Sequence, residues 1–355
     1  MTTAIAPANI AFIKYWGMRD AEQTLPYNGS LSMNLDACLT TTSVLFDPAL
    51  ESDHVTLTLY AQPPKVAVGR PHERVVTHLD RMRALAGVTT RARVTSSNNF
   101  PADAGIASSA AAFAALTLAG VAALGLDMDE RTLSRLTRRS GSGSASRSIP
   151  TGYVEWHNGD DLTSFAQSIV PPEHWDLADV VAVVDTQAKK IGSAENHHLA
   201  VTSPYFGVRL EGIQQRLDAA RTAIMQRDLT LLGTTMEADA VSMHVVCMTQ
   251  SPPSFYWNAG TMAVIHAVRA WREQGLEAYF TIDAGPNVHV ICEGGNRFIV
   301  QERLEALPEV QFTLVNRVGR GARLVHVNDE QDVHGGSSPA HERAGYTGAK
   351  PAGAG

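Results

Sequence analysis

Cysteine is scarce in this sequence, with only three in 355 residues, and no two of them form a CxxC pair. Thiols so few and so far apart predict buried side chains in a reducing compartment, and therefore a cytoplasmic protein. Excess positive charge is also missing, because 29 basic residues face 36 acidic ones and the formal net charge is −7. The sequence therefore predicts no nucleic-acid partner and no membrane partner, and a phosphate ligand would need a local cluster of donors.

Metal-ligand spacing is absent as well. The 13 histidines show no zinc-type pattern, and His197-His198 is predicted to lie on the surface or in a loop. No basic segment leads into an apolar stretch at the start, so no secretory signal is predicted. Residues 104–126 carry no charge and could span a membrane by length alone. They are mostly Ala, Gly, Ser and Thr between Asp103 and Asp127, which favours a helix buried between other layers.

The chain does have length and an apolar fraction of 44%, enough for a large core and two domains. Alternating or β-branched residues predict strands at 40–46, 54–60, 91–95, 152–156, 180–184, 278–282 and 288–292. Helical spacing predicts helices at 128–139, 209–225, 229–246 and 261–274. We expect one domain over residues 1–178, a second over 179–328, and a disordered tail over 329–355, where periodicity is lost.

The strongest motif is P-A-D-A-G-I-A-S-S-A-A at residues 101–111, a glycine-containing turn that leads into the uncharged helix. The free N–H groups of a helix N-terminus bind anions, and Ser108 and Ser109 could reach phosphate oxygens or Mg²⁺. No G-K-[ST] follows, so this is not a Walker A loop. A capped core helix explains the same residues equally well, because serine is ordinary at a helix start.

A second motif is R-R-S-G-S-G-S-A-S-R-S at residues 138–148. Alternating Gly and Ser is typical of a flexible linker. However, Arg147 lies within this tract and an apolar strand follows it, which favours a cradle of N–H, hydroxyl and guanidinium donors.

Two further stretches are weaker on their own. Asp283 ends an apolar strand in T-I-D-A-G-P-N, where either a turn-forming or an active-site aspartate is common. In I-K-Y-W-G-M-R, Lys14, Tyr15 and Arg19 suggest an anion grip, whereas Met18 between them can donate nothing.

Together these stretches resemble a known family. Six stretches are similar, in the same order, to motifs of the diphosphomevalonate decarboxylases: I-K-Y-W-G, L-P-Y-N-G-S-L-S-M-N-L-D, N-N-F-P-A-D-A-G-I-A-S-S-A-A, S-G-S-G-S-A-S-R-S with G-Y-V-E-W, S-P-P-S-F-Y-W and F-T-I-D-A-G-P-N. These belong to the GHMP kinase superfamily, and the resemblance runs from about Ala6 to about Val327. It implies an α+β, two-domain GHMP kinase-like fold with the active site in the interdomain cleft and ATP bound by the first domain.

The resemblance also implies a reaction. The family uses ATP and Mg²⁺ to phosphorylate a tertiary hydroxyl of a phosphorylated mevalonate, and then loses phosphate and CO₂ to leave an alkene. By motif match, Asp283 would lie against the 3-hydroxyl as a base or orienting group. Arg147 would pair with the substrate carboxylate, and Lys14 would support Asp283 and the developing charge.

The same match implies further site residues. The nucleotide and its Mg²⁺ would be bound by Asn98, Gly105, Ala107, Ser108, Ser109 and Lys190, with Ser108 and Ser109 as the metal contacts. The substrate would be bound by Tyr15, Met18, Arg74, Ser142, Gly143, Ser144 and Ser193. Family members are often homodimers, which predicts a homodimer here.

Two positions depart from the family pattern. Met18 stands where K-Y-W-G-K has lysine, and Ala194 stands where the loop S-S-R-E-G-M has arginine. Charge-assisted hydrogen bonds contribute roughly 1.5–3 kcal/mol each, so losing two would cost a diphosphate about 3–6 kcal/mol. We therefore predict mevalonate 5-phosphate as the substrate and isopentenyl phosphate as the product. The alternatives are a diphosphomevalonate decarboxylase, a 3-kinase without decarboxylation, and a non-catalytic sensor on the same fold. Arg19, Lys189, Lys190 or His198 could also replace the missing charges.

Overall fold

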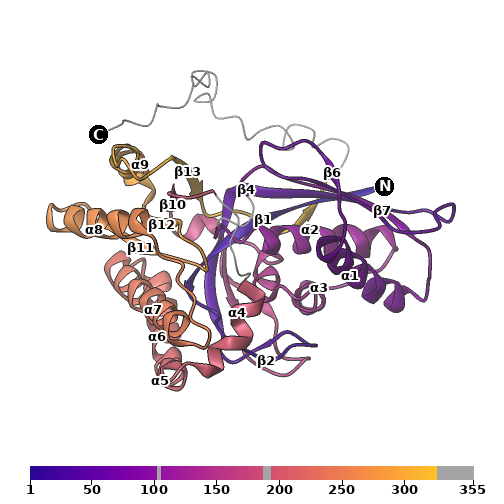
Figure 1. Ribbon diagram of the computed structural model, residues 1–355, viewed down its shortest axis with the longest axis horizontal. Helices are drawn as coiled ribbons and strands as arrows, with labels where there is room; N and C mark the ends of the chain where they lie inside the picture. The colour runs from indigo at the N-terminus through magenta and orange to yellow at the C-terminus, as the bar shows by residue number, and fades with distance from the viewer. Residues whose placement is uncertain (102–104, 187–192, 326–355) are drawn as a thin grey trace. The chain divides into compact units, whose positions relative to one another are not determined.

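The computed structural model describes residues 1–101, 105–186 and 193–325 (Figure 1). The chain divides into two compact units, Met1–Leu324 and Val325–Gly355, and the architecture below is that of the first. Its helices and mixed sheets form the α+β fold predicted from the sequence. The predicted tail at 329–355 lies outside the described residues.

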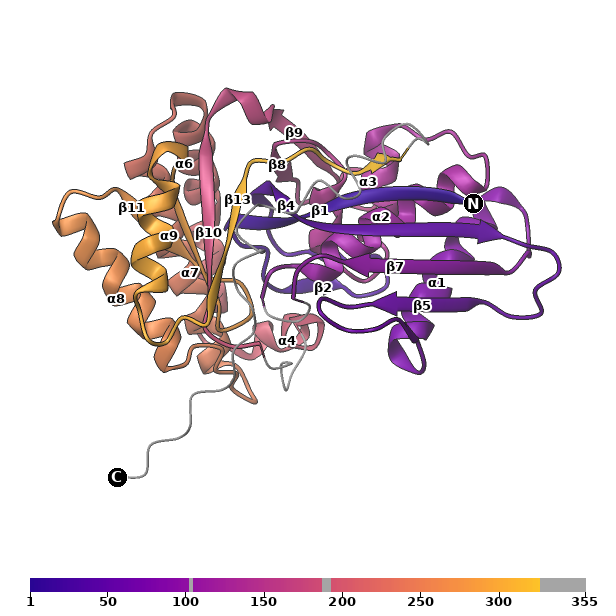
Figure 2. The same cartoon turned by 90° about the horizontal axis from the view of Figure 1, so that it is seen from above.

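The first half of the chain, together with the short strand β14 from its far end, builds an eight-stranded sheet around a long central strand. Strand β4 (Ser30–Phe46) pairs along one edge with β1 (Thr2–Ile13), and along the other edge with β7 (Ala92–Asn98) and β8 (Tyr153–Trp156). The remaining strands are β5 (His54–Thr58), β6 (Lys65–Val66), β9 (Ala166–Val170) and β14 (Arg323–Leu324). A separate ribbon joins β2 (Met18–Asp20) to β3 (Leu25–Pro26). Figure 2 shows β1, β7 and β5 running alongside one another.

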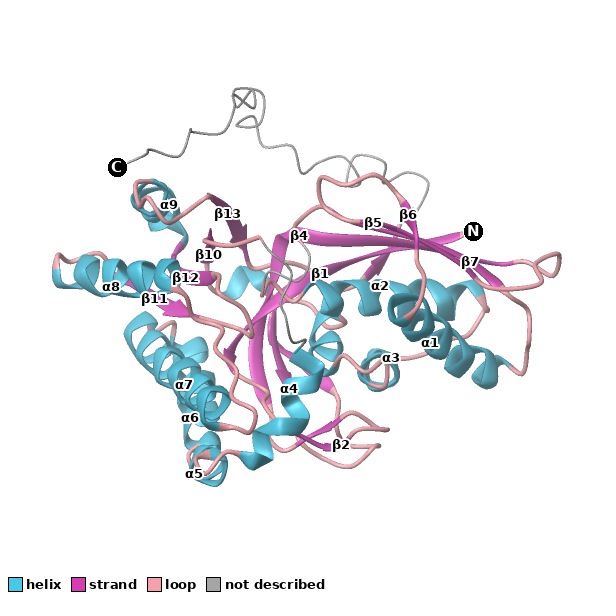
Figure 3. Ribbon diagram, viewed as in Figure 1, coloured by secondary structure: helices cyan, strands magenta, loops and turns pink. Residues whose placement is uncertain are grey.

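Three helices cover one face of this sheet, as Figure 3 shows: α1 (Arg70–Ala86), α2 (Ser108–Ala123) and α3 (Glu130–Arg138). Helix α2 comes from the uncharged run, and its alanines pack against β1 and β4 as well as the neighbouring helices. Small residues permit this close approach, since a Cβ on Gly120 would lie 2.7 Å from the sulfur of Met82 on α1. The prediction of a buried helix is confirmed, and no helix in the described ranges is long and apolar enough to cross a membrane.

The second half builds a four-stranded antiparallel sheet in the order β11 (Ala278–Thr281), β12 (Val288–Glu293), β10 (Leu177–Val183) and β13 (Phe312–Arg317). Alternate side chains on its strands point to opposite faces. One face packs on α8 (Ala259–Glu273) and α9 (Arg297–Glu305). The other joins a core that includes α6 (Ile213–Gln226), α7 (Leu229–Thr249), β1 and β4. This core therefore connects the two halves.

Three elements differ from the sequence-based expectation. The predicted helix at 209–225 is interrupted at Gly212, which separates α5 (Phe206–Glu211) from α6. Strand β7 runs to Asn98, three residues beyond the end predicted at residue 95. The Gly-Ser tract, for which the sequence favours a cradle over a linker, forms a 3₁₀ helix (Gly143–Ser148), in which Asn9 Nδ2 donates to the carbonyl of Ser144 (3.1 Å) and to Ser148 Oγ (2.8 Å).

Candidate active site

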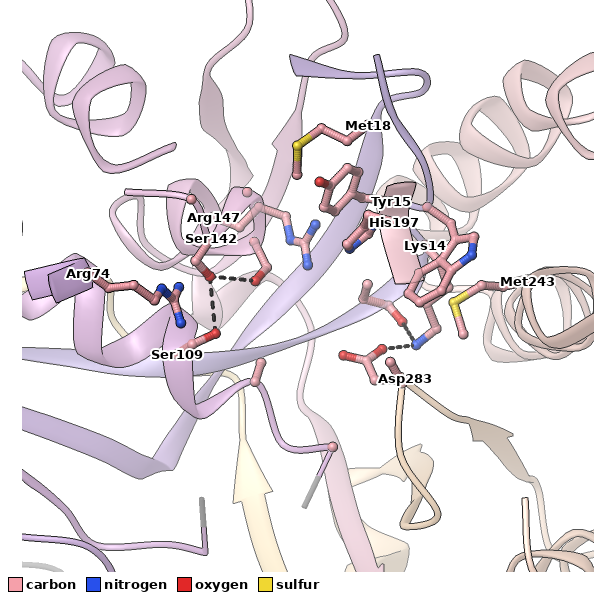
Figure 4. Close-up of a pocket in the computed structure, with 18 residues that line it drawn as sticks. Lys14, Tyr15, Met18, Arg74, Ser109, Ser142, Arg147, His197, Met243 and Asp283 are labelled. Carbon is pink, nitrogen blue, oxygen red and sulfur yellow. Dashed lines mark hydrogen bonds and ion pairs between the residues drawn. The ribbon is translucent and has the colours of Figure 1, made fainter. Parts of the chain in front are cut away.

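Segments from both halves of the chain line one pocket (Figure 4). In chain order, the elements that line the pocket are the end of β1, helix α1, the start of α2, the Gly-Ser tract, α4 (Ser193–Leu199), α7 and the loop between β11 and β12. Its lining residues are Ala11, Lys14, Tyr15, Trp16, Met18, Arg74, Gly105, Ala107, Ser109, Gly141, Ser142, Gly143, Ser144, Arg147, His197, Met243, Asp283 and Ala284.

An ion pair joins the two halves within the pocket. Lys14 directly follows β1, and its Nζ donates to Asp283 Oδ1 (2.5 Å) and to the carbonyl of Ala11 (2.7 Å). Both residues line the pocket, and the aspartate side chain (21% exposed) is more accessible than the lysine (2% exposed). Burial lowers the pKa of Lys14 despite the nearby Asp283. Burial would raise the pKa of Asp283, but the charges of Lys14, His289 and Arg147 and the hydrogen bond from Lys14 together outweigh it and hold that pKa below its ordinary value.

This pair predicts a characteristic pH dependence. As the pH rises, Lys14 loses its proton earlier than a free lysine, so kcat should fall on the alkaline side at a pH below 10.5, the ordinary lysine pKa. A guanidinium at position 14 would hold its proton to a higher pH than the lysine, because the ordinary pKa of arginine is about 12.5 or above. The alkaline limb of the pH–kcat profile should therefore move to higher pH in Lys14→Arg, whatever the absolute rate of that variant. An unchanged limb in Lys14→Arg would assign it to another group.

A second, fully buried ion pair holds the backbone of Lys14. Asp239 Oδ2 accepts from the Lys14 N–H (2.7 Å), and Arg209 Nη2 donates to the Lys14 carbonyl (3.0 Å). The two side chains also bond one another through Arg209 Nη1 and Asp239 Oδ1 (3.0 Å), and both are at most 1% exposed. Asn28 Nδ2 donates to the same carbonyl (2.9 Å), and Arg216 Nε lies 3.3 Å from Asp239 Oδ1. We call Asp239 and Arg209 the Lys14 clamp.

Arg147 is a buried cation held only by neutral oxygens. Its Nε and Nη2 donate to Asn9 Oδ1 (3.1 and 3.0 Å), and its Nη1 donates to Ser30 Oγ (2.6 Å). The residue is 3% exposed, and burial lowers its pKa to about 10. Within the described ranges, no carboxylate forms an ion pair with Arg147. A buried charge is costly without a partner, so this guanidinium is suited to binding an anionic group of a ligand.

The start of α2 forms the opposite wall. Gly105 has a φ of +85°, and an added Cβ would lie 3.3 Å from the Cα of Gly285, so the turn before α2 touches the turn that follows Asp283. The residue before α2, Ala107, is left-handed (φ +49°), and its methyl side chain cannot cap the helix. Ser109 Oγ lies 3.1 Å from Ser142 Oγ, so the helix start and the Gly-Ser tract meet here. Free N–H groups and hydroxyls in this arrangement suit a phosphate.

Aromatic rings form the remaining wall. Tyr15 meets Trp156 edge-on (centroids 4.8 Å apart) and stacks on His197 (4.1 Å). An added Cβ on Gly143 would lie 2.6 Å from Trp156, so this position requires glycine for the tract to reach the wall. Met18 packs against the same rings and lines the pocket. The predicted surface position of His197 is wrong, because the residue is buried at 8% exposure in α4.

Most predicted site residues converge on this pocket, but some do not. Asn98 and Ser108 are not among its lining residues, and Asn98 Oδ1 instead accepts from Thr40 Oγ1 (2.9 Å). Ser193 begins α4 with its side chain outside the described part, and Lys190 lies outside the described residues. Sequence reasoning missed the lining residues Ala11, Trp16, Gly141, His197, Met243 and Ala284. Trp16, Gly141 and Ala284 lie within quoted motifs (I-K-Y-W-G, the Gly-Ser tract and T-I-D-A-G-P-N), whereas Ala11, His197 and Met243 have no local sequence pattern that identifies them.

Solved structures with the same fold place the chain in a class. The mevalonate diphosphate decarboxylase from Staphylococcus aureus matches with a TM-score of 0.84 at 33% identity, covering 92% of this chain and 98% of that one. A structure named MDDEF in complex with MVAPP, AMPPCP and magnesium also has a TM-score of 0.84, at 36% identity, covering 92% and 99%. The fold is the two-domain α+β fold of the GHMP kinase superfamily, as the sequence predicted.

Sequence comparison narrows this class. A diphosphomevalonate decarboxylase-like N-terminal domain matches residues 6–168, and a mevalonate 5-diphosphate decarboxylase C-terminal domain matches residues 179–328. The human diphosphomevalonate decarboxylase is 35% identical over 309 residues, which are 80% of this chain and 75% of the human protein. The chain belongs to the diphosphomevalonate decarboxylase family. The predicted preference for a monophosphate is not supported, because these relatives are named for the diphosphate.

Proposed function

We propose that this protein is an ATP-dependent decarboxylase that converts mevalonate 5-diphosphate to isopentenyl diphosphate. The observation that carries the proposal is Arg147, a buried guanidinium without an ion-pair partner in the described ranges, in the same pocket as the Lys14–Asp283 pair. A substrate carboxylate would supply the missing anion. The names of the relatives support mevalonate 5-diphosphate as the substrate, which was the alternative to mevalonate 5-phosphate in the sequence analysis.

The wall at the start of α2 fits ATP and Mg²⁺. The N-cap residue of the helix is alanine, and its first turn has no acidic residue, so its N–H groups and dipole favour a phosphate. Ser109 Oγ is a hard oxygen of the kind that Mg²⁺ prefers. A complex of MDDEF with AMPPCP and magnesium supports the same assignment. When bound, ATP supplies the phosphoryl group that makes the 3-hydroxyl a good leaving group, and Mg²⁺ neutralises phosphate charge.

The side chains of this protein then have separate tasks. Asp283, kept ionised by Lys14, accepts or orients the proton of the 3-hydroxyl. Arg147 holds the carboxylate of the substrate so that its C–C bond lies in line with the departing oxygen. The charge of Lys14 remains beside the reacting oxygen and stabilises the charge that develops there. We also propose that the division between domains lies at 178/179, and that the protein is a homodimer.

A second candidate for the substrate is mevalonate 5-phosphate, and the residue that favours it is Met18. Met18 lines the pocket at the aromatic wall and can donate no hydrogen bond. The adjacent Arg19 does not compensate, because its Nε donates to the carbonyl of Pro26 (2.9 Å) and its Nη2 to the carbonyl of Gly159. A monophosphate needs fewer donors than a diphosphate.

Competition between the two substrates in one assay separates these candidates. We expect a kcat/KM for the diphosphate at least tenfold above that for the monophosphate, with CO₂ and ADP released in equal amounts. A larger kcat/KM for the monophosphate would establish the second candidate. ADP without CO₂ would make the protein a 3-kinase, and absence of turnover with both substrates would refute the proposal.

A further inference from the structure

His197 is held rigidly at the aromatic wall of the pocket. Its ring stacks on Tyr15 with centroids 4.1 Å apart and an interplanar angle of 20°, and it lies 4.5 Å from the ring of Trp16. The residue is more than nine-tenths buried, yet it lines the pocket. A ring packed in this way has little freedom to rotate, so the direction of each ring nitrogen is set by the fold.

The hydrogen bonding of His197 determines where its proton lies. The backbone N–H of Gly17 donates to Nδ1 (3.1 Å), so Nδ1 must carry a lone pair. Burial lowers the pKa of the imidazole to about 3, which keeps the ring neutral at physiological pH. In a neutral ring with Nδ1 as acceptor, Nε2 carries the hydrogen and is a donor.

This donor has no partner within the described part of the chain, where the contact of Nδ1 with Gly17 accounts for the ring's hydrogen bonding. In Figure 4, His197 lies beside Tyr15, with Arg147 and Met18 nearby. Arg147 is close enough to His197 for its positive charge to contribute to the lowered pKa of the imidazole. An N–H without a partner on a buried ring, beside a guanidinium that forms no ion pair in the described ranges, indicates a place for an anionic oxygen.

We propose that His197 is a specificity-determining residue whose neutral Nε2–H binds the phosphoryl end of the substrate. This inference rests on the proposed function, since it assigns the phosphoryl end of the same substrate. The stacked ring places a donor at the wall where Met18 provides none. A neutral donor satisfies one phosphate oxygen without adding charge, so the wall favours phosphorylated ligands over unphosphorylated mevalonate through hydrogen bonding.

Two substitutions test the donor directly. In His197→Gln the amide nitrogen extends to about the position of Nε2, whereas in His197→Asn the shorter amide reaches only the position of Nδ1 and can still accept from Gly17. We expect His197→Asn to raise KM for the phosphorylated substrate about tenfold or more, since a lost hydrogen bond to a charged group has that effect. His197→Gln should stay within about threefold of wild type. The kcat and the KM for ATP should change less than about twofold in both.

Inorganic pyrophosphate and unphosphorylated mevalonate serve as probes for the location of the effect. Inhibition by pyrophosphate, competitive with the substrate, should weaken about tenfold in His197→Asn, while inhibition by mevalonate stays unchanged. The matched control is His266→Asn, at an exposed histidine of α8 that does not line the pocket, and it should leave both inhibition constants unchanged. If His197→Asn weakened inhibition by both probes equally, or did not weaken pyrophosphate binding, the inference would be overturned. Pyrophosphate binding measured by calorimetry tests it even if wild type releases no CO₂, an outcome that would overturn the proposed function alone.

Discussion

Replacement of Asp283 by asparagine is expected to lower kcat about 10²–10⁴-fold, the range that a positioned general base contributes. The carboxylate is the more accessible part of the Lys14–Asp283 pair, whereas the lysine is nearly inaccessible. Asparagine keeps the size and one oxygen of the side chain, but it can neither accept the hydroxyl proton nor balance the charge of Lys14. The loss should therefore appear in CO₂ release and in ADP formation together, with KM for ATP changed less than about threefold.

The control for this variant is Asp218→Asn. Asp218 lies on the exposed surface of α6, bonded to Arg221 (2.7 Å) in an i,i+3 pair, and it does not line the pocket. The variant Asp218→Asn should therefore leave kcat unchanged. If Asp283→Asn retained more than a tenth of the wild-type kcat, Asp283 would be an orienting group at most, and the proton would leave by another route.

Elements with a strong local pattern could be predicted from the sequence. The helical spacing at 229–246 and 261–274 corresponds to α7 and α8, and the apolar run at 180–184 corresponds to β10, which lies between two strands as expected. Strand β1 was missed. Ten of its twelve residues are buried, so it lacks the alternation that marks a half-exposed strand.

The site divides in the same way. Lys14, Arg147 and Asp283 lie in motifs, and the structure brings all three to one pocket although Lys14 and Asp283 are 269 positions apart. The groups that position them carry no motif. Asp239 acts through a hydrogen bond to a residue 225 positions away, and His197 through one to a residue 180 positions away. Such roles arise from tertiary packing, which local spacing does not encode.

The Lys14 clamp should be needed for stability as well as activity. Asp239→Asn would leave the fully buried Arg209 without its carboxylate and would weaken the bond to the Lys14 N–H. Removing one partner of a buried ion pair costs about 3–5 kcal/mol, so we expect the free energy of unfolding to fall by about that amount in denaturant titrations. The kcat should fall as well, because the clamp holds the backbone of the residue that orients Asp283.

The exposed pair between Arg317 and Asp176 provides the comparison for this prediction. Both of its side chains are 51% exposed, so Asp176→Asn should change the free energy of unfolding by at most about 1 kcal/mol. The double variant Asp239→Asn with Arg209→Gln should recover part of the stability, because position 209 then no longer carries a buried charge without its carboxylate. The double variant should not recover kcat, since the charged hydrogen bonds from Asp239 and Arg209 to the Lys14 backbone are still lost. A loss below about 1 kcal/mol in Asp239→Asn alone would show that Arg216 and Asn28 suffice to hold this junction.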